Sequence, residues 1–223
     1  MSDIKFKDIY PLELEQIEPD AFYHDKTHTY WLNGERVLSN TQILELAGYI
    51  DKSNYQPHHA ARGTRVHQGV HFLAEGELEW STVSPQDEPY IRSYEKAIAE
   101  LGFKIVACEK IYINRTYRLG TRIDQEIIQL SDGREGVLEL KSGYMQPWTA
   151  YQTTLQVMTK WPDSYYDKVR IGMELKKDGS KARIERYTDI NDFNIAIAAI
   201  VTAYDKQKNW GNTNGISNGA RHG

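Results

Sequence analysis

Three ionisable residues on one short hairpin have the types that metal-assisted hydrolysis requires. Asp124 lies in "GTRIDQEIIQL", a turn follows at "SDGREG", and Glu139 and Lys141 lie in "GVLELKSG". Residues two apart on a strand share a face, so Glu139 and Lys141 point the same way. Pairing of the two strands then brings Asp124 beside Glu139. Two carboxylates this close repel each other strongly unless a cation lies between them.

Carboxylate oxygens at such a site suit Mg²⁺ or Mn²⁺. A lysine alongside can hold an attacking water or steady a phosphate oxygen. The hairpin therefore predicts a site of metal-assisted phosphodiester hydrolysis, in which Asp124 and Glu139 converge on one divalent cation.

An acid two residues before a lysine also occurs in Asp3-Ile4-Lys5 and in Glu174-Leu175-Lys176. Most such triplets are solvated strand faces whose ion pairs contribute little. Neither has both an acid across a plausible hairpin and a helix immediately after it. We therefore expect the site at Glu139 and Lys141.

Turn and capping signals predict the elements of the N-terminal half. Asn33-Gly34 suits a tight turn between two strands. Ser39 is placed to cap a short helix that ends at Gly48. The predicted elements are a hairpin at residues 28–39 and helices at residues 40–48, 57–75 and 85–102.

The hydrophobic period changes from residue 103 onward, and strands become the expected elements. The order of elements predicts one α+β domain with a mixed sheet over residues 1–208. A Gly/Asn-rich tail at 209–223 is expected to be mobile. The predicted elements are strands at 103–114, 117–130 and 136–143, a helix at 146–161, strands at 165–177 and 181–188, and a helix at 189–208.

Two helical stripes add candidate residues. His67, His71 and Glu75 recur every four residues, which puts them on one stripe of a helix. The "HQGVH" run resembles the zinc-protease pattern HExxH, but Gln68 replaces the glutamate base, so a zinc protease is not expected. Gln152 and Gln156 lie one turn apart on the helix after Lys141, and Gln156 is interpreted as part of a solvated face.

Together these segments resemble the PD-(D/E)xK nuclease superfamily, in its RecB-like and phage-exonuclease-like branch. The resemblance spans about residues 28 to 160, and its strength is the order of four motifs. Ile123 stands where the family name has proline, one extra residue separates Gly120 from Asp124, and Gln156 replaces the usual tyrosine. The matching motifs are Gly63 to His67, Gly120 to Asp124, Glu139-Leu140-Lys141, and Gln152.

The resemblance implies a restriction-endonuclease-like αβββαβ core and a role for each matching residue. Catalysis is assigned to Asp124, Glu139, Lys141 and Gln152. The metal ligands are His67, Asp124, Glu139 and the carbonyl of Leu140, holding Mg²⁺ or Mn²⁺. His67 is preferred to His71 because Gly63, one turn earlier, is expected to let the helix approach the strand of Asp124. Contacts to DNA are assigned to Arg62, Arg65 and Arg122 for phosphates, and to Tyr144 and Trp148 for stacking on an unpaired base.

Composition sets outer limits on the function. The 223 residues are 40% apolar and 26% charged, which is typical of a soluble globular protein. The net charge of −4 argues against a surface that coats nucleic acid all over. The single cysteine, Cys108, excludes a four-cysteine iron–sulfur cluster. No apolar run approaches the ~18 residues of a membrane span, no signal-peptide core is present, and a cytoplasmic setting is expected.

The leading hypothesis is a metal-dependent DNA exonuclease of phage recombination or repair. Enzymes of this branch commonly work with a single-strand annealing protein, which is therefore the expected partner besides DNA. The alternatives are an endonuclease of the same fold and a catalytically silent module that binds nucleic acid. The sequence leaves the oligomeric state open.

Overall fold

A computed structural model describes residues 14–51 and 57–216, with side chains described for residues 14–51 and 60–208. The helices are α1 (Asn40–Ala47), α2 (Pro57–Glu75), α3 (Glu88–Ile98), α4 (Thr149–Lys160) and α5 (Asn191–Ile216). The strands are β1 (Leu14–Glu18), β2 (Ala21–His24), β3 (Thr29–Leu32), β4 (Glu35–Ser39), β5 (Phe103–Asn114), β6 (Leu119–Gln129), β7 (Glu135–Lys141), β8 (Val169–Glu174) and β9 (Arg183–Arg186).

Local signals in the sequence explain the boundaries of the first elements. Asn33 and Gly34 have φ angles of 54° and 74°, the left-handed pair that a tight hairpin turn between β3 and β4 needs. Ser39 and Gln42 form a capping box at the start of α1. Gly48 ends α1 with a φ of 90°. The predicted hairpin and the predicted short helix are both confirmed.

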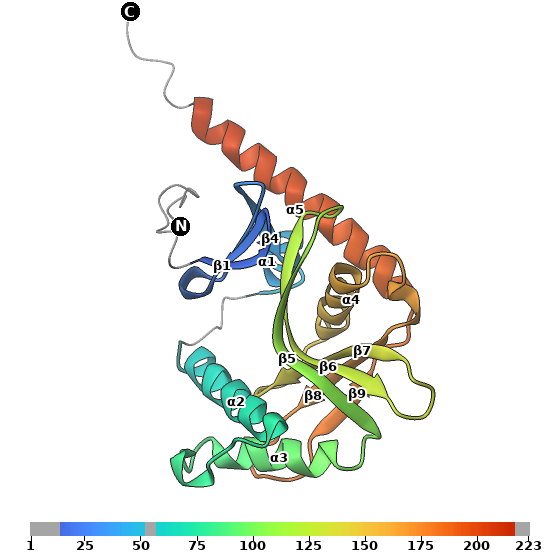
Figure 1. Ribbon diagram of the computed structural model, residues 1–223. Helices are drawn as coiled ribbons and strands as arrows, with labels where there is room; N and C mark the ends of the chain where they lie inside the picture. Colours follow the sequence, from blue (N-terminus) through green and yellow to red (C-terminus); the bar gives the residue numbers. More distant parts are fainter. Residues whose placement is uncertain (1–13, 52–56, 217–223) are drawn as a thin grey trace, which may run out of the picture.

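The strands form one mixed sheet flanked by helices, as the sequence predicts. Among the described residues its order is β1-β2-β3-β4-β6-β7-β8-β9, with β5 paired to β6. The pairs β4–β6 and β7–β8 are parallel and the others antiparallel. In Figure 1 helices α2 and α3 lie at one side of the sheet, and α4 lies between the sheet and the long helix α5. The fold is α+β.

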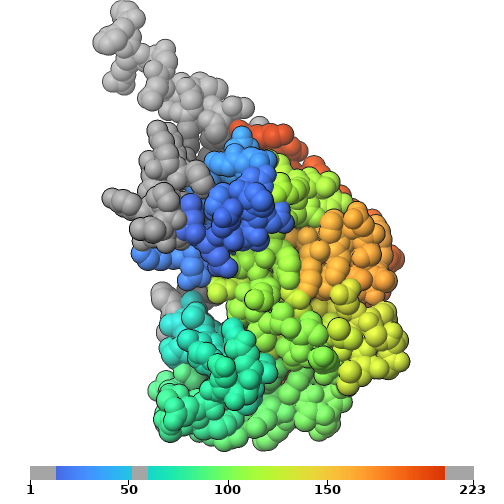
Figure 2. Space-filling view, viewed as in Figure 1, coloured from blue at the N-terminus to red at the C-terminus, as the bar shows by residue number. Residues whose placement is uncertain are grey.

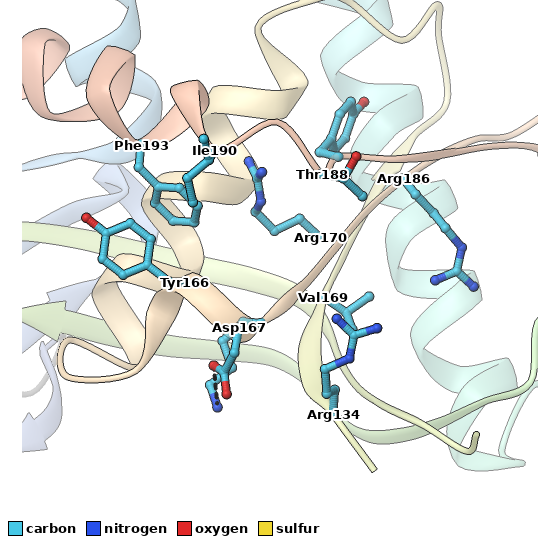
Figure 3. Close-up of a pocket in the computed structure, with 11 residues that line it drawn as sticks. Arg134, Tyr166, Asp167, Val169, Arg170, Arg186, Thr188, Ile190 and Phe193 are labelled. Carbon is cyan, nitrogen blue, oxygen red and sulfur yellow. Dashed lines mark ion pairs between the residues drawn. The ribbon is translucent and has the colours of Figure 1, made fainter. Parts of the chain in front are cut away.

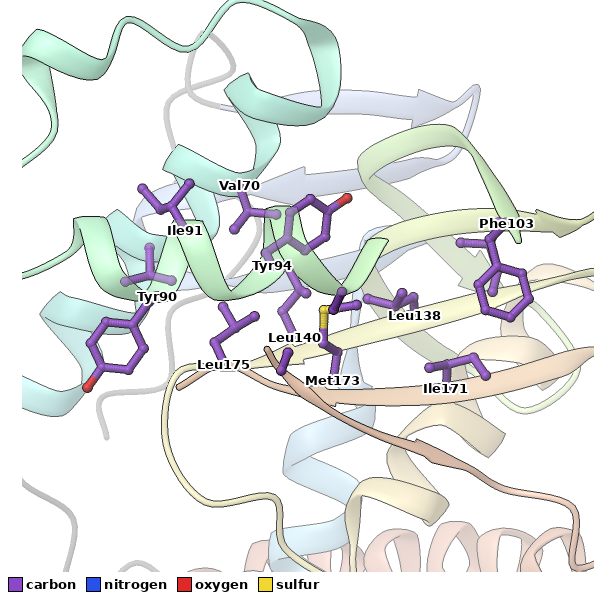
Figure 4. Close-up of a cluster of buried hydrophobic side chains, with 14 of the residues drawn as sticks. Val70, Tyr90, Ile91, Tyr94, Phe103, Leu138, Leu140, Ile171, Met173 and Leu175 are labelled. Atoms are coloured by element: carbon purple, nitrogen blue, oxygen red, sulfur yellow. The ribbon is translucent and has the colours of Figure 1, made fainter. Parts of the chain in front are cut away.

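Two apolar clusters hold the helices to the sheet. Residues of α2 and α3, such as Val70 and Tyr94, pack against Leu138 and Leu140 of β7 (Figure 4). On the other face, α1, α4 and α5 pack against β6 and Val137 of β7. Leu138 and Leu140 therefore face α2–α3, and the alternation of a strand turns Val137 the other way.

The sheet divides at the point where the candidate residues lie. The antiparallel register of β6 with β7 ends at Gln125 opposite Leu138. Before that point β6 runs beside β4, with Gly120 opposite Ser39. Strand β7 continues beside β8 to its last residue. The two strands therefore separate next to Asp124, which leaves backbone groups of β7 available to side chains.

Several element boundaries differ from the predicted ones. The hairpin of β1 and β2 was not predicted, because its strands are only five and four residues long, too short to show a clear period. Helix α3 begins at Glu88 rather than Pro85, with Pro89 in its first turn, a position where proline is tolerated. Helix α5 continues to Ile216, so it runs into the segment predicted as a mobile tail. Extending an existing helix costs less than starting one. Residues 217–223 lie outside the described residues.

Within residues 14–51 and 57–216, no helix combines the length and the apolar character that spanning a bilayer requires.

Two glycines of the predicted motifs have opposite roles, which gives a test of the packing. A Cβ at Gly120 would overlap the ring of Tyr30, whereas one at Gly63 would meet only Ser142 Oγ at 3.8 Å. The reason given for Gly63 was therefore wrong: α2 packs most closely at Gly69, where a Cβ would overlap Ile91 of α3.

We expect Gly120→Ala to lower the free energy of unfolding by about 1–3 kcal/mol through overpacking. Gly63→Ala is expected to be neutral or to stabilise by up to about 1 kcal/mol, because alanine favours a helix. Urea unfolding of the two variants measures both values. Equal destabilisation by the two substitutions would contradict the packing described for Gly120.

Candidate metal centre and cleft

A large cleft of about 1590 Å³ opens beside the division of the sheet. Its walls are α2, the middle of β5 and β6, the segment after β7, and the turn after β8. Figure 2 shows the N-terminal strands and helices α2–α3 as separate masses on one face, with residues of the central strands between them. Predicted site residues that line the cleft are Arg62, His67, Arg122, Asp124, Leu140, Lys141 and Tyr144.

Asp124 bridges the gap that opens between β6 and β7. Its Oδ2 accepts a 2.7 Å hydrogen bond from the backbone N–H of Leu140, and its Oδ1 lies 3.4 Å from Nδ1 of His67. Burial would raise the pKa of Asp124, but the positive charges of His67 and Lys141 and the Leu140 N–H outweigh it and lower the pKa. Asp124 is therefore a fixed carboxylate anion. Leu140 contributes its N–H here, and its carbonyl as a ligand stays a prediction.

His67, Glu109 and Asp124 form a candidate metal-ligand group in this cleft, called the metal-ligand group below. One ligand atom from each lies within 4.8 Å of those of the other two. An imidazole nitrogen and two carboxylates are ligands for Mn²⁺ or Mg²⁺. Burial and the charge of Asp124 raise the pKa of Glu109 to about 7. A bound cation would relieve the repulsion between the two carboxylates. The group could hold a metal ion, and the structure does not identify which ion.

Glu109 was missed by the sequence analysis, although a signal for it exists. Cys108 pairs with Gln125 and Lys110 with Ile123, so Glu109 lies across from Asp124 on the neighbouring strand. The turn between β5 and β6 joins Asn114 to Leu119, and Glu109 and Asp124 lie at equal distances along the chain from these two residues. Counting outward from the turn along both strands therefore places Glu109 opposite Asp124. Glu109 has a φ of 54°, uncommon for a residue with a side chain.

Glu139 lies beside this group and is held by amides. Its Oε1 accepts hydrogen bonds of 2.7 Å from Gln152 and from Lys141, and its Oε2 accepts one of 2.7 Å from Gln156. Burial and the charge of Asp124 raise the pKa of Glu139. Gln156 is completely buried, so its interpretation as part of a solvated face was wrong. Convergence of Asp124 and Glu139 on one cation stays a prediction.

Lys141 has a defined position in the cleft wall. Its Nζ donates to Glu139 and, at 2.8 Å, to Oε1 of Gln152, and lies 4.8 Å from the centre of the Trp148 ring. A carboxylate, an amide and an aromatic face thus fix the ammonium group. The catalytic role that the resemblance gives Gln152 stays a prediction.

The second acid-x-Lys triplet lies beside the first. Parallel pairing of β7 and β8 puts Glu174 next to Lys141. Glu174 is buried, and its Oε2 accepts a 2.9 Å hydrogen bond from the N–H of Met145. A Cβ at Gly172 would overlap the sulfur of Met145, so glycine provides the space for that side chain. Glu174 and Gly172 therefore hold Met145 in place, and with it the segment between Lys141 and Trp148.

The residues predicted to contact DNA are not all in one place. Arg62, Arg122 and Tyr144 line the cleft, and Tyr144 is 85% exposed. Arg65 instead pairs with Asp87 through two bonds of 2.7 and 3.1 Å and is not part of the lining. Trp148 packs against the apolar cluster formed with α1, α4 and α5, and it does not line the cleft either. Base stacking and phosphate binding by these five residues stay predictions.

The described residues also form a smaller hollow of about 160 Å³ near the start of α5. Figure 3 shows Arg134, Arg170 and Arg186 around it. Arg170 is buried and pairs with Asp192 at 2.8 Å, while its other nitrogen donates to the carbonyl of Asp189. These contacts fix the start of α5 to β8. Asp167 is the one acid in the lining of this hollow, and the group of three metal-ligating residues found among the described residues lies in the larger cleft, which is therefore the candidate site.

The titration of His67 predicts a pH dependence of metal binding. Burial opposes its protonation, but the charge of Asp124 outweighs burial and raises the pKa of His67 to about 9. A metal ligand must be a neutral imidazole, so at neutral pH a cation has to displace a proton. We expect the apparent affinity for Mn²⁺ to rise about tenfold per pH unit until the pH passes the pKa of His67.

Calorimetric titration in buffers of different ionisation enthalpy measures the proton released. His67→Gln is the control and should remove this contribution. A metal affinity that does not change with pH would contradict ligation by His67.

Comparison with protein-family models gives no match for this chain, and comparison with curated proteins gives none either.

Proposed function

We propose that this protein is a metal-dependent deoxyribonuclease that hydrolyses phosphodiester bonds in the large cleft. One observation carries the proposal. The metal-ligand group of His67, Glu109 and Asp124 lies beside the Glu139–Lys141 pair, at the point where β6 and β7 separate. The order of α3, β5, β6, β7, α4 and β8 also agrees with the αβββαβ core of the PD-(D/E)xK nucleases that the motifs resemble.

Each residue has a distinct part in the proposed reaction. A divalent cation, when bound, supplies Lewis-acid stabilisation of the charge that develops on the phosphate. His67, Glu109 and Asp124 hold it, with Glu139 adjacent. Lys141 donates a hydrogen bond to the attacking water or to a phosphate oxygen, and Gln152 keeps the ammonium in place. Buried amides hold Glu139 so that no reorganisation is needed during the reaction.

Within this function an exonuclease is favoured by the resemblance to the phage-exonuclease-like branch. The bacterial cytoplasm and a single-strand annealing partner are what that resemblance implies. An endonuclease of the same fold remains the alternative, because the same metal-ligand group and lysine would suit phosphodiester hydrolysis at a strand end and within a strand.

The test is a titration of Mg²⁺ and of Mn²⁺ with linear and with circular duplex DNA, using 5′- and 3′-labelled ends. Loss of label from the ends of linear DNA that leaves circles intact supports the exonuclease. Nicking of circles supports the endonuclease. Absence of turnover with both metals and both substrates would overturn the enzymatic function and leave a binding module.

A further inference from the structure

The positive charges of the cleft differ in whether an acid already neutralises them. Arg122 pairs with Glu109 at 2.9 Å and with Asp25 at 3.3 Å. Lys141 pairs with Glu139, and Lys176 with Glu174. Among the described residues, neither of the remaining lining cations, Arg62 and Lys177, makes an ion pair. Free positive charge is therefore confined to the part of the cleft between α2 and the turn after β8.

Arg62 also has an unused hydrogen-bond donor. Its guanidinium lies 5.3 Å from the centre of the Tyr90 ring, and its Nε is buried without a hydrogen-bond partner. Buried donors are nearly always paired. The Nε of Arg122 in the same cleft also lacks a hydrogen bond, but an oxygen of Glu109 lies 2.9 Å from it. Arg62 has no such acid among the described residues, so an anion is the group that would complete its interactions. The guanidinium fork matches the oxygens of a phosphate.

Among the described residues, few atoms lie within contact distance of a Cβ at Gly143 or at Gly63, the two glycines next to Arg62. A Cβ at Gly143 would find only a terminal nitrogen of Arg62, at 4.0 Å, and one at Gly63 would find only Ser142 Oγ, at 3.8 Å. Helix α2 and the segment after Lys141 thus lie close together at Gly63, Ser142 and Gly143, and these three residues present backbone and one hydroxyl to the cleft that they line. A phosphodiester could approach the backbone there, directly after the lysine of the proposed site.

Lys177 is carried by a turn that is tied to α3. The N–H of Lys176 donates to Ser93 Oγ at 2.9 Å, and Lys96 Nζ donates to the carbonyl of Gly179 at 2.6 Å. These bonds on either side of Lys177 hold the turn in place. Lys177 therefore adds a second unpaired positive charge to the lining of the cleft that also holds Arg62.

We propose that Arg62, Ser142–Gly143 and Lys177 form a binding track for backbone phosphates of a DNA strand, on the α2 and β8 side of the metal-ligand group. This inference rests on the proposed function and adds the direction in which the bound strand leaves the reacting phosphate. Arg122, which pairs with Asp25 and Glu109, is not part of this track.

The experiment measures binding of a short fluorescein-labelled DNA duplex by anisotropy, over a range of salt concentrations and with EDTA present to prevent cleavage. A track of three to five phosphates gives the wild type a slope of log K against log[salt] of about −2 to −5. Arg62→Ala and Lys177→Ala are each expected to raise Kd about 3- to 10-fold and to reduce that slope by about one. Lys104→Ala, at an exposed position outside the cleft lining, is the matched control and should change neither value.

Binding and cleavage are separate readouts, so the two ideas fail separately. Wild-type Kd and slope in both Arg62→Ala and Lys177→Ala would overturn the track, even with metal-dependent cleavage intact. A slope near −10 would do the same, because the contact surface would then exceed the cleft. Absence of cleavage with either metal would overturn the nuclease, whatever the binding data show.

Discussion

Replacing Lys141 by alanine is expected to abolish cleavage while leaving duplex binding almost unchanged. The Lys141 ammonium is fixed by Glu139, Gln152 and Trp148 at the edge of the metal-ligand group. A group that assists proton transfer or orients the water typically accounts for about 10²–10⁴-fold in rate. One ammonium is only a small part of a phosphate-contact surface, so Kd should change by less than about threefold. Single-turnover cleavage and anisotropy on the same preparation give both numbers.

Lys176→Ala is the matched control for Lys141→Ala, because Lys176 ends the same acid-x-Lys pattern, which begins at Glu174 on the adjacent strand β8. Lys176 pairs with Glu174 and has no contact with Glu139 or Gln152. Its loss is expected to leave the rate within about tenfold of wild type. Cleavage by Lys141→Ala at the wild-type rate would show that the lysine is structural.

His67→Ala is expected to remove most of the activity and to change the preference between metals, whereas His71→Ala is not. His67 is part of the metal-ligand group, while Nε2 of His71 lies 3.0 Å from Oε1 of Glu75 on the same helix. Changing a residue that only hydrogen-bonds to a metal ligand already costs about 10–100-fold in activity or metal affinity, so loss of a ligand should exceed about 100-fold. Removing the softer imidazole should also reduce the advantage of Mn²⁺ over Mg²⁺.

The assay compares kcat/KM of both variants in each metal, with thermal unfolding as a measure of folding. His71→Ala is expected to lower the midpoint of unfolding and to keep the wild-type metal preference. An inactive His71→Ala variant, or full activity in both variants, would remove His67 from the metal site and leave α2 with a structural role.

The sequence by itself determined which residues share a face and where most elements begin and end. Glu139 and Lys141 point together because a strand has a period of two, and both contact Gln152 in the structure. The cap at Ser39 and the turn at Asn33-Gly34 were predictable because each depends on the conformational preferences of a few neighbouring residues. Asp124, Glu139 and Lys141 were identified as candidates in this way, together with the mixed sheet that carries them.

Only the tertiary structure decided which distant residues meet these candidates. Glu109 faces Asp124 because of the register of β5 on β6, and Glu174 lies beside Lys141 because β8 crosses over to pair with β7 in parallel. Helix periodicity alone could not show that Gln156 is buried against Glu139 rather than solvated.

The same limit explains why the arginines were harder to place than the carboxylates. Arg65 is bound by Asp87, and Arg62 keeps an unpaired donor in the cleft, although the two lie one turn apart on α2. Local sequence fixes periodicity, caps and turns because those depend on neighbours along the chain. Register, crossovers and the pairing of charges depend on how remote segments pack, so the partners of the site are set only when the whole sheet forms.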